Sequence, residues 1–280
     1  MKPLTAETLE YAPPPTRPAL RWHGGKYLLA PWIVENLPAH RVYVEPFGGA
    51  ASVLLRKPRS YAEIYNDLDD DVVNLFRVLR DPVAADALVD AVSLTPFARV
   101  EQVEAYEMAA DPVERARRLI VRSYMGFGSN GTHRKTGFRA NSNRSGTTPS
   151  RDWANYPAGL AEVAARFQGV VVEHRDAKAV MAAHDSPETL HYVDPPYLPA
   201  TRDKGSDYAH EMTAEQHGEL LAFLQTLAGK VVLSGYPSPT YDAALPGWRR
   251  IERAALADGA KARTEVLWLS PNACERGLFQ

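Results

Sequence analysis

The stretch Glu45-Pro46-Phe47-Gly48-Gly49-Ala50-Ala51-Ser52 follows a short apolar strand predicted at 41–44, and a helix is predicted to start near Ser52. A strand, a turn of small residues and a helix form the first unit of a doubly wound α/β nucleotide-binding sheet. Small residues let a cofactor lie against the turn and the helix N-terminus. The dinucleotide fingerprint Gly-x-Gly-x-x-Gly is absent, which argues against NAD or FAD.

A second strand is predicted at 61–65, and it ends at Asn66-Asp67. An acid at this place in such a sheet can bind both hydroxyls of a ribose. Asp67 or Asp69 could instead cap the helix predicted at 70–79. The two roles can be divided between the two acids.

The remaining elements predict a Rossmann-like α/β sheet that carries a mostly helical insert. Strands are predicted at 170–173, 189–193 and 230–234, followed by a terminal antiparallel hairpin at 248–254 and 264–269 joined through Asp258-Gly259. Helices are predicted at 27–36, at 177–183, and from the capping box Thr213-Ala214-Glu215-Gln216 to near Gly229. In the insert, Pro82, Pro96 and Pro112 predict helix starts capped by Asp81, Thr95 and Asp111, and the third helix covers 112–125.

The turn Asp194-Pro195-Pro196-Tyr197 directly follows the strand predicted at 189–193. The prolines remove two N–H donors but keep their carbonyl acceptors, and Asp194 adds further acceptor oxygens. Tyr197 supplies a flat ring. Such a turn suits a planar group with an exocyclic amine, for example an adenine or cytosine turned out of a duplex. The alternative is a rigid turn with no chemical role.

Positive charge is concentrated in one part of the chain, although the net charge is −2. The segment 115–151 holds nine Lys/Arg and no acid, whereas the other residues hold 23 Lys/Arg and 34 acids. This segregation predicts a basic patch for nucleic acid on an acidic body. The alternative is a solvated loop that lacks acids.

Within this basic segment, 126–150 is rich in Gly, Ser, Asn, Thr and Arg and is predicted to be irregular. Arg and Asn hydrogen-bond phosphates and the edges of guanine and adenine. Phe127, His133 and Phe138 are interleaved with them and could stack or wedge, although local packing is the simpler role for each.

Bulk features exclude several classes of protein. Cys274 is the only cysteine, so we expect no internal disulfide and no cysteine-based zinc cluster. No uncharged apolar run approaches the ~20 residues that span a bilayer, and no secretory signal is recognisable. We therefore expect a cytoplasmic protein with no membrane segment. The Pro-rich residues 1–18 are predicted to form a flexible arm.

Taken together, the motifs occur in an informative order: Gly24-Gly25-Lys26, Pro46-Phe47-Gly48-Gly49, Asn66-Asp67, the basic insert, Asp176 and Asp194-Pro195-Pro196-Tyr197. This order resembles the Dam-like DNA adenine-N6 methyltransferases, over nearly the whole chain from Arg21 to about Asn272. The resemblance implies an S-adenosylmethionine-dependent methyltransferase sheet and a flipped adenine in double-stranded DNA as methyl acceptor. It implies no metal, and it leaves the oligomeric state open.

The resemblance also assigns roles to residues. The implied catalytic residues are Asp194, Pro195, Pro196 and Tyr197. The implied cofactor-binding residues are Trp22, Gly25, Lys26, Glu45, Pro46, Phe47, Gly49, Asp67, Asp176 and Asp194. Asn130 and Arg134 match the DNA-contacting hairpin, and the basic segment adds Arg122, Lys135, Arg139 and Arg144 as DNA-binding candidates.

The implied organisation is a catalytic domain at 19–80 and 166–280 with an inserted target-recognition domain at 81–165. Three residues depart from the family pattern. Relatives commonly have a small residue at His23, a glycine at Ala51 and an aromatic residue at Ser129.

Other functions remain as alternatives. A cytosine-N4 DNA methyltransferase is the nearest, followed by an RNA or protein-glutamine methyltransferase. A non-catalytic DNA-binding module that keeps the cofactor fold belongs to a different class. A bacterial or phage-infected cell is the expected setting, and neither a restriction partner nor a recognition site can be read from the sequence.

Overall fold

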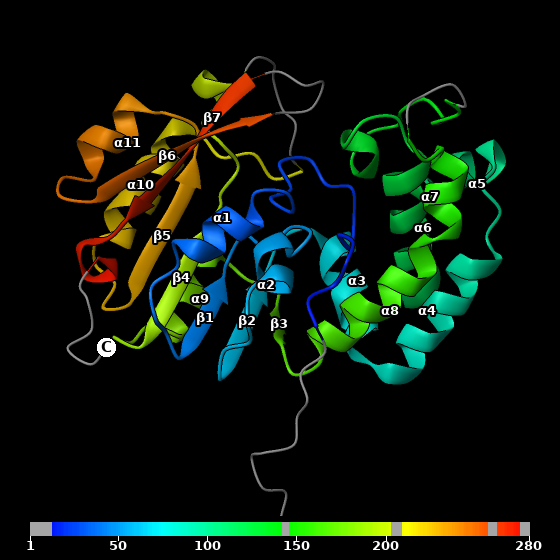
Figure 1. Cartoon of the computed structure of the whole chain (residues 1–280), viewed down its shortest axis with the longest axis horizontal. Helices are drawn as coiled ribbons and strands as arrows, with labels where there is room; N and C mark the ends of the chain where they lie inside the picture. Colours follow the sequence, from blue (N-terminus) through cyan, green and yellow to red (C-terminus); the bar gives the residue numbers. More distant parts are fainter. Residues whose placement is uncertain (1–12, 142–145, 203–208, 257–261, 275–280) are drawn as a thin grey trace, which may run out of the picture.

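The computed structural model describes residues 13–141, 146–202, 209–256 and 262–274, and it contains a seven-stranded sheet in the order β3-β2-β1-β4-β5-β7-β6 (Figure 1). Strands β1 to β5 run parallel where they pair, and β7 is antiparallel to both β5 and β6. The strands are β1 (Val42–Glu45), β2 (Ala62–Asn66), β3 (Val171–Glu173), β4 (Thr189–Val193), β5 (Lys230–Gly235), β6 (Arg249–Leu256) and β7 (Ala262–Leu269). The predicted Rossmann-like sheet with a terminal antiparallel hairpin is therefore confirmed. The Asp258-Gly259 connection lies outside the described residues.

Alternate residues of the strands face two different cores. Tyr43 and Tyr192 pack on one face with α1 (Ala30–Glu35), α2 (Ser52–Arg56) and α3 (Asp70–Arg80). Val44 and Val193 pack on the other face with α9 (Ala177–Ala183), α10 (Ala214–Leu224) and α11 (Pro239–Ala244). Successive side chains of a strand point to opposite faces, so both helical layers bury apolar side chains of the same strands.

Five helices lie between α3 and β3 and form the lobe on the right of Figure 1. They are α4 (Pro82–Leu94), α5 (Arg99–Glu104), α6 (Pro112–Met125), α7 (Pro149–Ala154) and α8 (Tyr156–Phe167). Phe167 of α8 stacks on Phe76 of α3 with ring centroids 4.3 Å apart. Residues of α4, α6, α7, α8 and the sheet belong to one continuous apolar cluster. Among the described residues, the insert therefore shares its hydrophobic core with the sheet and does not form a separate core.

Most predicted helix starts agree with the structure. Asp81 and Asp111 cap α4 and α6 through their carboxylates, and Thr213 and Gln216 form the capping box of α10. The start predicted at Pro96 is wrong. Thr95 ends α4 and its hydroxyl donates to the carbonyl of Ala91, so α5 begins only at Arg99.

Two other helices are shorter than predicted. The helix predicted at 27–36 begins only at Ala30, because 27–29 form a turn and Pro31 fits only the first helical turn. The helix predicted to run to Gly229 ends at Leu224. Asp185 accepts the N–H groups of Ala228 and Gly229, which gives that backbone a partner outside the helix.

The described end of the predicted N-terminal arm makes specific contacts. Thr16 donates through its N–H and its hydroxyl to Glu162 of α8, and the carbonyl of Pro18 accepts from the Tyr124 hydroxyl. Residues 13–18 therefore lie along the helical insert and are not a free extension. Residues 1–12 lie outside the described part of the chain.

Candidate active site

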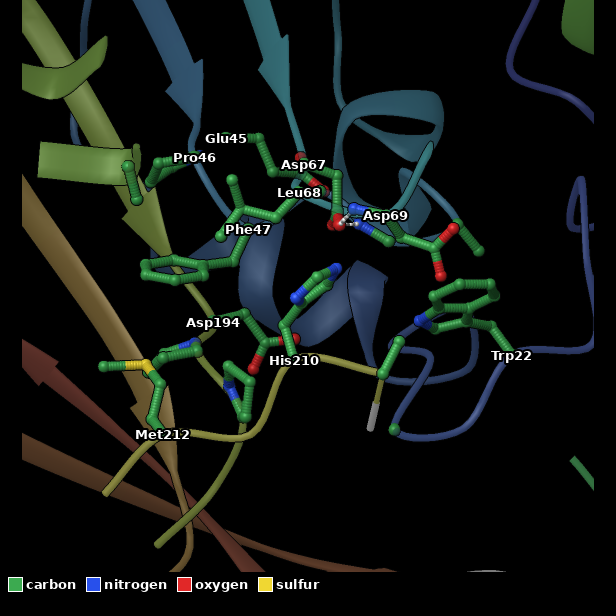
Figure 2. A pocket seen from close by; sticks show the side chains of 18 of the residues that line it. Trp22, Glu45, Pro46, Phe47, Asp67, Leu68, Asp69, Asp194, His210 and Met212 are labelled. Atoms are coloured by element: carbon green, nitrogen blue, oxygen red, sulfur yellow. Dashed lines mark hydrogen bonds between the residues drawn. The ribbon is translucent and has the colours of Figure 1, made fainter. Parts of the chain in front are cut away.

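A cavity of about 350 Å³ opens at the carboxyl ends of β1, β2 and β4 (Figure 2). In a parallel sheet this edge is the usual ligand-binding site, because several strand ends and helix N-termini converge there. All ten residues predicted to bind a cofactor line this one cavity, together with Pro195 and Pro196. The sheet thus brings together residues that are up to 172 positions apart, from Trp22 to Asp194.

The glycine turn after β1 is fixed by its neighbours. Gly49 donates its N–H to Asp67 over 2.7 Å and accepts the Tyr65 hydroxyl over 2.7 Å. A Cβ atom at Gly48 would lie 2.1 Å from the Tyr65 ring, and one at Gly49 would lie 2.7 Å from Trp22 Nε1. Neither position has room for a side chain, so the two glycines allow Tyr65 and Trp22 to approach the turn closely.

Ala51 stands in a backbone conformation that L-residues rarely adopt. Its φ angle is +54° and ψ is 34°, which is left-handed, and it directly precedes α2. The glycine common at this position in the resembled family therefore has a conformational reason in addition to a steric one. Small size alone is therefore an incomplete explanation of the residue preferred at this position.

The two acids after β2 have separate roles. Asp69 caps α3 by accepting the N–H groups of Asp71 and Val72. Asp67 does not cap the helix, but accepts from Gly49 and from Asp69 and lies on the cavity wall. Burial raises the pKa of Asp67 above its usual value. Of the two interpretations left open by the sequence, the helix cap belongs to Asp69, and Asp67 is the acid that is hydrogen-bonded to the glycine turn; both acids line the cavity.

Asp194 is held at both carboxylate oxygens. The Ser234 hydroxyl of β5 donates to Oδ1 over 2.7 Å, and Lys26 Nζ lies 3.0 Å from Oδ2. Lys26 is itself buried and donates to the carbonyl of Gly24 over 2.7 Å. Ser234 was not predicted from the sequence, although a serine near the end of the neighbouring strand was a usable signal.

Tyr197 lies behind the cavity rather than on its wall. Its side chain is buried, its hydroxyl donates to Glu265 over 2.8 Å, and its ring meets Tyr236 edge-on at 4.6 Å. Lys26 Nζ lies 4.7 Å from the centre of the Tyr197 ring. Burial raises the pKa of Glu265. Tyr236 and Glu265, which hold Tyr197, were not identified from the sequence.

Glu45 places a buried carboxyl on the cavity wall. It accepts hydrogen bonds from the Tyr43 hydroxyl (2.7 Å) and the Leu54 N–H (2.9 Å). Burial, strengthened by the nearby charge of Asp194, raises the pKa of Glu45 to about 8. The carboxyl is therefore mostly protonated at neutral pH unless a cation approaches it.

Aromatic and imidazole rings complete the wall. Phe47 and Trp22 border the cavity in Figure 2, and Asp176 caps α9 by accepting from Ala179. His133 of the insert also lines the cavity and contacts Trp22 edge-on at a centroid distance of 4.8 Å. The insert thus contributes directly to the site, which the sequence did not reveal.

The predicted basic patch is largely neutralised within α6. Its arginines pair with acids from α3, α5 and α6 itself: Arg115 and Arg122 with Asp71, Arg117 with Glu101 and Glu114, and Arg118 with Glu114. Hydrogen bonds from Arg117, and then from Arg118, lower the pKa of Glu114 to about 2. The helical part of the predicted basic patch therefore carries less free positive charge than the sequence count, because charge counted along the chain omits partners from other elements.

The other DNA-binding candidates lie after α6. Asn130 belongs to the short helix η1 (Asn130–Thr132), and Arg134 and Lys135 follow with exposed side chains. Arg139 pairs with Asp152 at 3.2 Å. Arg144 lies outside the described residues.

No described helix combines the length and apolar character needed to cross a membrane. Nor does the described part of the chain contain three or more His, Cys, Asp or Glu side chains grouped to hold a metal ion.

Comparison with known proteins shows the family of this chain. The family model for D12 class N6 adenine-specific DNA methyltransferases matches residues 22–252. Because the match covers most of the chain, the protein belongs to that family. The predicted family, fold class and adenine-specific DNA methyltransferase activity are thereby confirmed.

Named relatives carry the same description. The chain is 28% identical to a DNA adenine methylase of Escherichia coli K12 over 222 residues, which cover 75% of this chain and 76% of the relative. It is 27% identical to one of Salmonella typhi over 219 residues, with the same coverage. A Serratia marcescens DNA adenine methylase is 41% identical over 64 residues, and this match spans only 23% of either chain.

Proposed function

We propose that this adenine-specific DNA methyltransferase takes its methyl group from S-adenosylmethionine and acts on adenine N6 after the base has left a DNA duplex. The observation that carries the proposal is Asp194, which the Ser234 hydroxyl orients on the wall of the cavity that also contains the glycine turn. A methyl donor and an acceptor amine can thus meet in one cavity.

The donor groups around the cavity fit such a cofactor. Asp67 lies at the end of β2, where an acid can accept both hydroxyls of a ribose. Glu45 and Asp194 offer oxygens to a cationic methionine moiety, and Phe47 and Trp22 offer apolar ring surface. S-adenosylmethionine, when bound, supplies a methyl group on a sulfonium that leaves as a neutral thioether. Asp176 is proposed to face the adenine of the cofactor, as the family resemblance implies.

The chain's own residues would activate and align the amine. The lone pair of adenine N6 is delocalised into the ring, so the free amine is a poor nucleophile. Hydrogen bonds from N6 to Asp194 and to the Pro195 carbonyl would favour a pyramidal nitrogen with a localised lone pair. The same acceptors stabilise the positive charge that develops on N6. Pro195 and Pro196 keep these acceptors in place, since their φ angles are fixed.

When the base enters, Lys26 would leave Asp194 and the Tyr197 ring, and the base would take its place at both. For the Tyr197 ring to stack on the base, the Lys26 ammonium has to leave its position 4.7 Å from that ring. We propose that Lys26 compensates the charge of Asp194 while the base is absent and yields to N6 when it enters. Tyr197 stays held by Glu265 throughout.

The insert, residues 81–165, is the proposed target-recognition domain. Asn130, Arg134 and Lys135 are its proposed base and phosphate contacts, and Arg139 supports them from its ion pair with Asp152. Arg122, which pairs with Asp71, is a weaker candidate because binding DNA would cost that ion pair. A cytoplasmic location remains a prediction.

The test is incubation with radiolabelled-methyl S-adenosylmethionine and unmethylated mixed-sequence DNA, followed by nucleoside analysis. N6-methyladenine confined to one short sequence motif is the expected product. Label on cytosine N4 would contradict the assignment of the base. No transfer to DNA by protein that still binds the cofactor would contradict the proposed substrate.

A further inference from the structure

The three aromatic residues of the irregular segment have different surroundings. His133 packs edge-on against Trp22 at 4.8 Å, and Phe138 packs against Phe97 at 5.0 Å. Phe127, in contrast, is 70% exposed. The His133 and Phe138 rings are therefore packed against other side chains, whereas the large apolar ring of Phe127 is exposed to solvent.

The backbone that carries Phe127 is firmly held. Its N–H donates to the Gly137 carbonyl (2.8 Å) and the Thr136 hydroxyl (3.1 Å), next to an antiparallel bridge between Gly126 and Phe138. A Cβ atom at Gly126 would lie 2.6 Å from the Arg122 carbonyl, so this turn fits closely onto the end of α6. An exposed ring on a fixed turn is preorganised for contact, since little further ordering is needed.

The same segment reaches the rim of the cavity. Ser129 Oγ lies 3.3 Å from Nδ1 of His23, and both His23 and His133 line the cavity. Along the chain, Phe127 lies two residues before Ser129, which contacts His23, and six residues before His133. The exposed Arg134 and Lys135 follow on the same segment and suit a phosphate backbone. DNA whose base enters the cavity would pass over this segment.

We propose that Phe127 is the wedge that enters the base stack and fills the space left by the extruded adenine. This inference rests on the proposed extrusion of the base. Apolar side chains that insert between base steps unstack them and stabilise the opened duplex. The Ser129 side chain is instead within hydrogen-bond distance of His23, which lines the cavity. Phe127 is a positioning residue, because it would act on the DNA and not on the reacting atoms.

The test compares a paired duplex with one in which the target adenine faces an abasic site and is already unpaired. Phe127→Ala should reduce kcat/KM on the paired duplex roughly tenfold or more, because the stacking that offsets extrusion is lost. On the abasic duplex the loss should stay within about threefold. The rise in fluorescence of 2-aminopurine at the target position should also be lost, and Phe127→Trp should restore it.

Met108→Ala is the matched control, since Met108 is 99% exposed in the same insert but lies outside the segment at the cavity rim. It should behave as wild type in every assay. Equal loss on both duplexes for Phe127→Ala, or unchanged 2-aminopurine fluorescence, would overturn the wedge. Absence of methyl transfer by the wild-type protein would instead overturn the proposed function.

Discussion

Lys26 Nζ lies 3.0 Å from Asp194 Oδ2 and 4.7 Å from the centre of the Tyr197 ring. In the proposed mechanism a target base needs both of these positions, one for its amine and one for its ring. The Lys26 ammonium therefore occupies the position proposed for the amine of the target base. Lys26 belongs to the Gly24-Gly25-Lys26 motif and precedes Asp194 by 168 residues. Base binding and the release of Lys26 from Asp194 are then linked steps.

Asp194→Ala tests whether this carboxylate acts on the amine. We expect single-turnover methyl transfer to fall by about 10³ or more, the upper range for removing one preorganised electrostatic partner. Cofactor binding, measured by equilibrium dialysis, should change by less than about tenfold, since Asp67 and the glycine turn are retained. Ser234→Ala is the graded comparison, because it leaves the carboxylate but removes its 2.7 Å hydrogen bond. An Asp194→Ala protein with normal transfer would contradict the mechanism.

The pKa of about 8 at Glu45 predicts a pH-dependent affinity for the cofactor. Because the pKa is raised, the carboxyl is protonated below pH 8, whereas a bound cation favours the carboxylate. Binding should therefore release a proton below pH 8, and affinity should increase from pH 6 to 8 and then level off. Titration calorimetry in buffers of different ionisation enthalpy measures the released proton. The Glu45→Gln variant should bind the cofactor more weakly and release no proton on binding. If proton release is unchanged in this variant, the proton comes from a group other than Glu45.

Ala51→Gly should stabilise the protein. Left-handed backbone costs an L-residue about 1–2 kcal/mol, and the lost methyl burial and the added freedom of the unfolded chain offset part of that gain. A net increase of about 0.5 kcal/mol in the free energy of unfolding is expected from urea titration. Ala50→Gly, at a buried neighbour without a positive φ, should instead destabilise. Equal destabilisation by both substitutions would argue against strain at Ala51.

Sequence patterns located the cavity well because its residues are local to strand ends. Pro46, Gly49, Asp67 and Asp194 each follow a recognisable strand, and parallel strands bring their carboxyl ends to one edge. The helix caps at Asp81 and Asp111 were predictable for the same reason, since a cap depends on the next few residues.

Contacts between distant segments could not be read in this way. Glu265 holds Tyr197 across 68 residues, and Asp71 neutralises Arg122 across 51. Nothing near Tyr197 or Arg122 in the sequence identifies these partners. The number of arginines in a segment therefore overestimates its free positive charge. The residues that contact Tyr197 can be identified only when the positions of the strands in the sheet are known.

A buried arginine attaches the last helix of the lobe to the sheet. Arg166 of α8 is 1% exposed, and its guanidinium lies 2.7 Å from Glu63 of β2, which also pairs with Lys57 at 2.7 Å. Burial alone would raise the pKa of Glu63, but hydrogen bonds and charges from Arg166 and Lys57 hold it below its usual value. Arg166 also donates to the Leu54 carbonyl, so one side chain joins α8 to β2 and α2.

Arg166→Ala should lower the free energy of unfolding by about 3–5 kcal/mol, because it leaves a buried carboxylate short of a partner. Lys178→Ala is the matched control, since its ion pair with Glu219 is 40% and 64% exposed and should contribute less than about 1 kcal/mol.

The lowered pKa of Glu63 also predicts how the stability difference between wild type and Arg166→Ala depends on pH. Its stabilisation is present above the unfolded pKa and is lost as pH falls through the folded value, so the difference between wild type and Arg166→Ala should shrink in acid. Urea titrations at pH 7 and pH 4 measure both effects, and a difference that grows in acid would contradict the assigned ion pair.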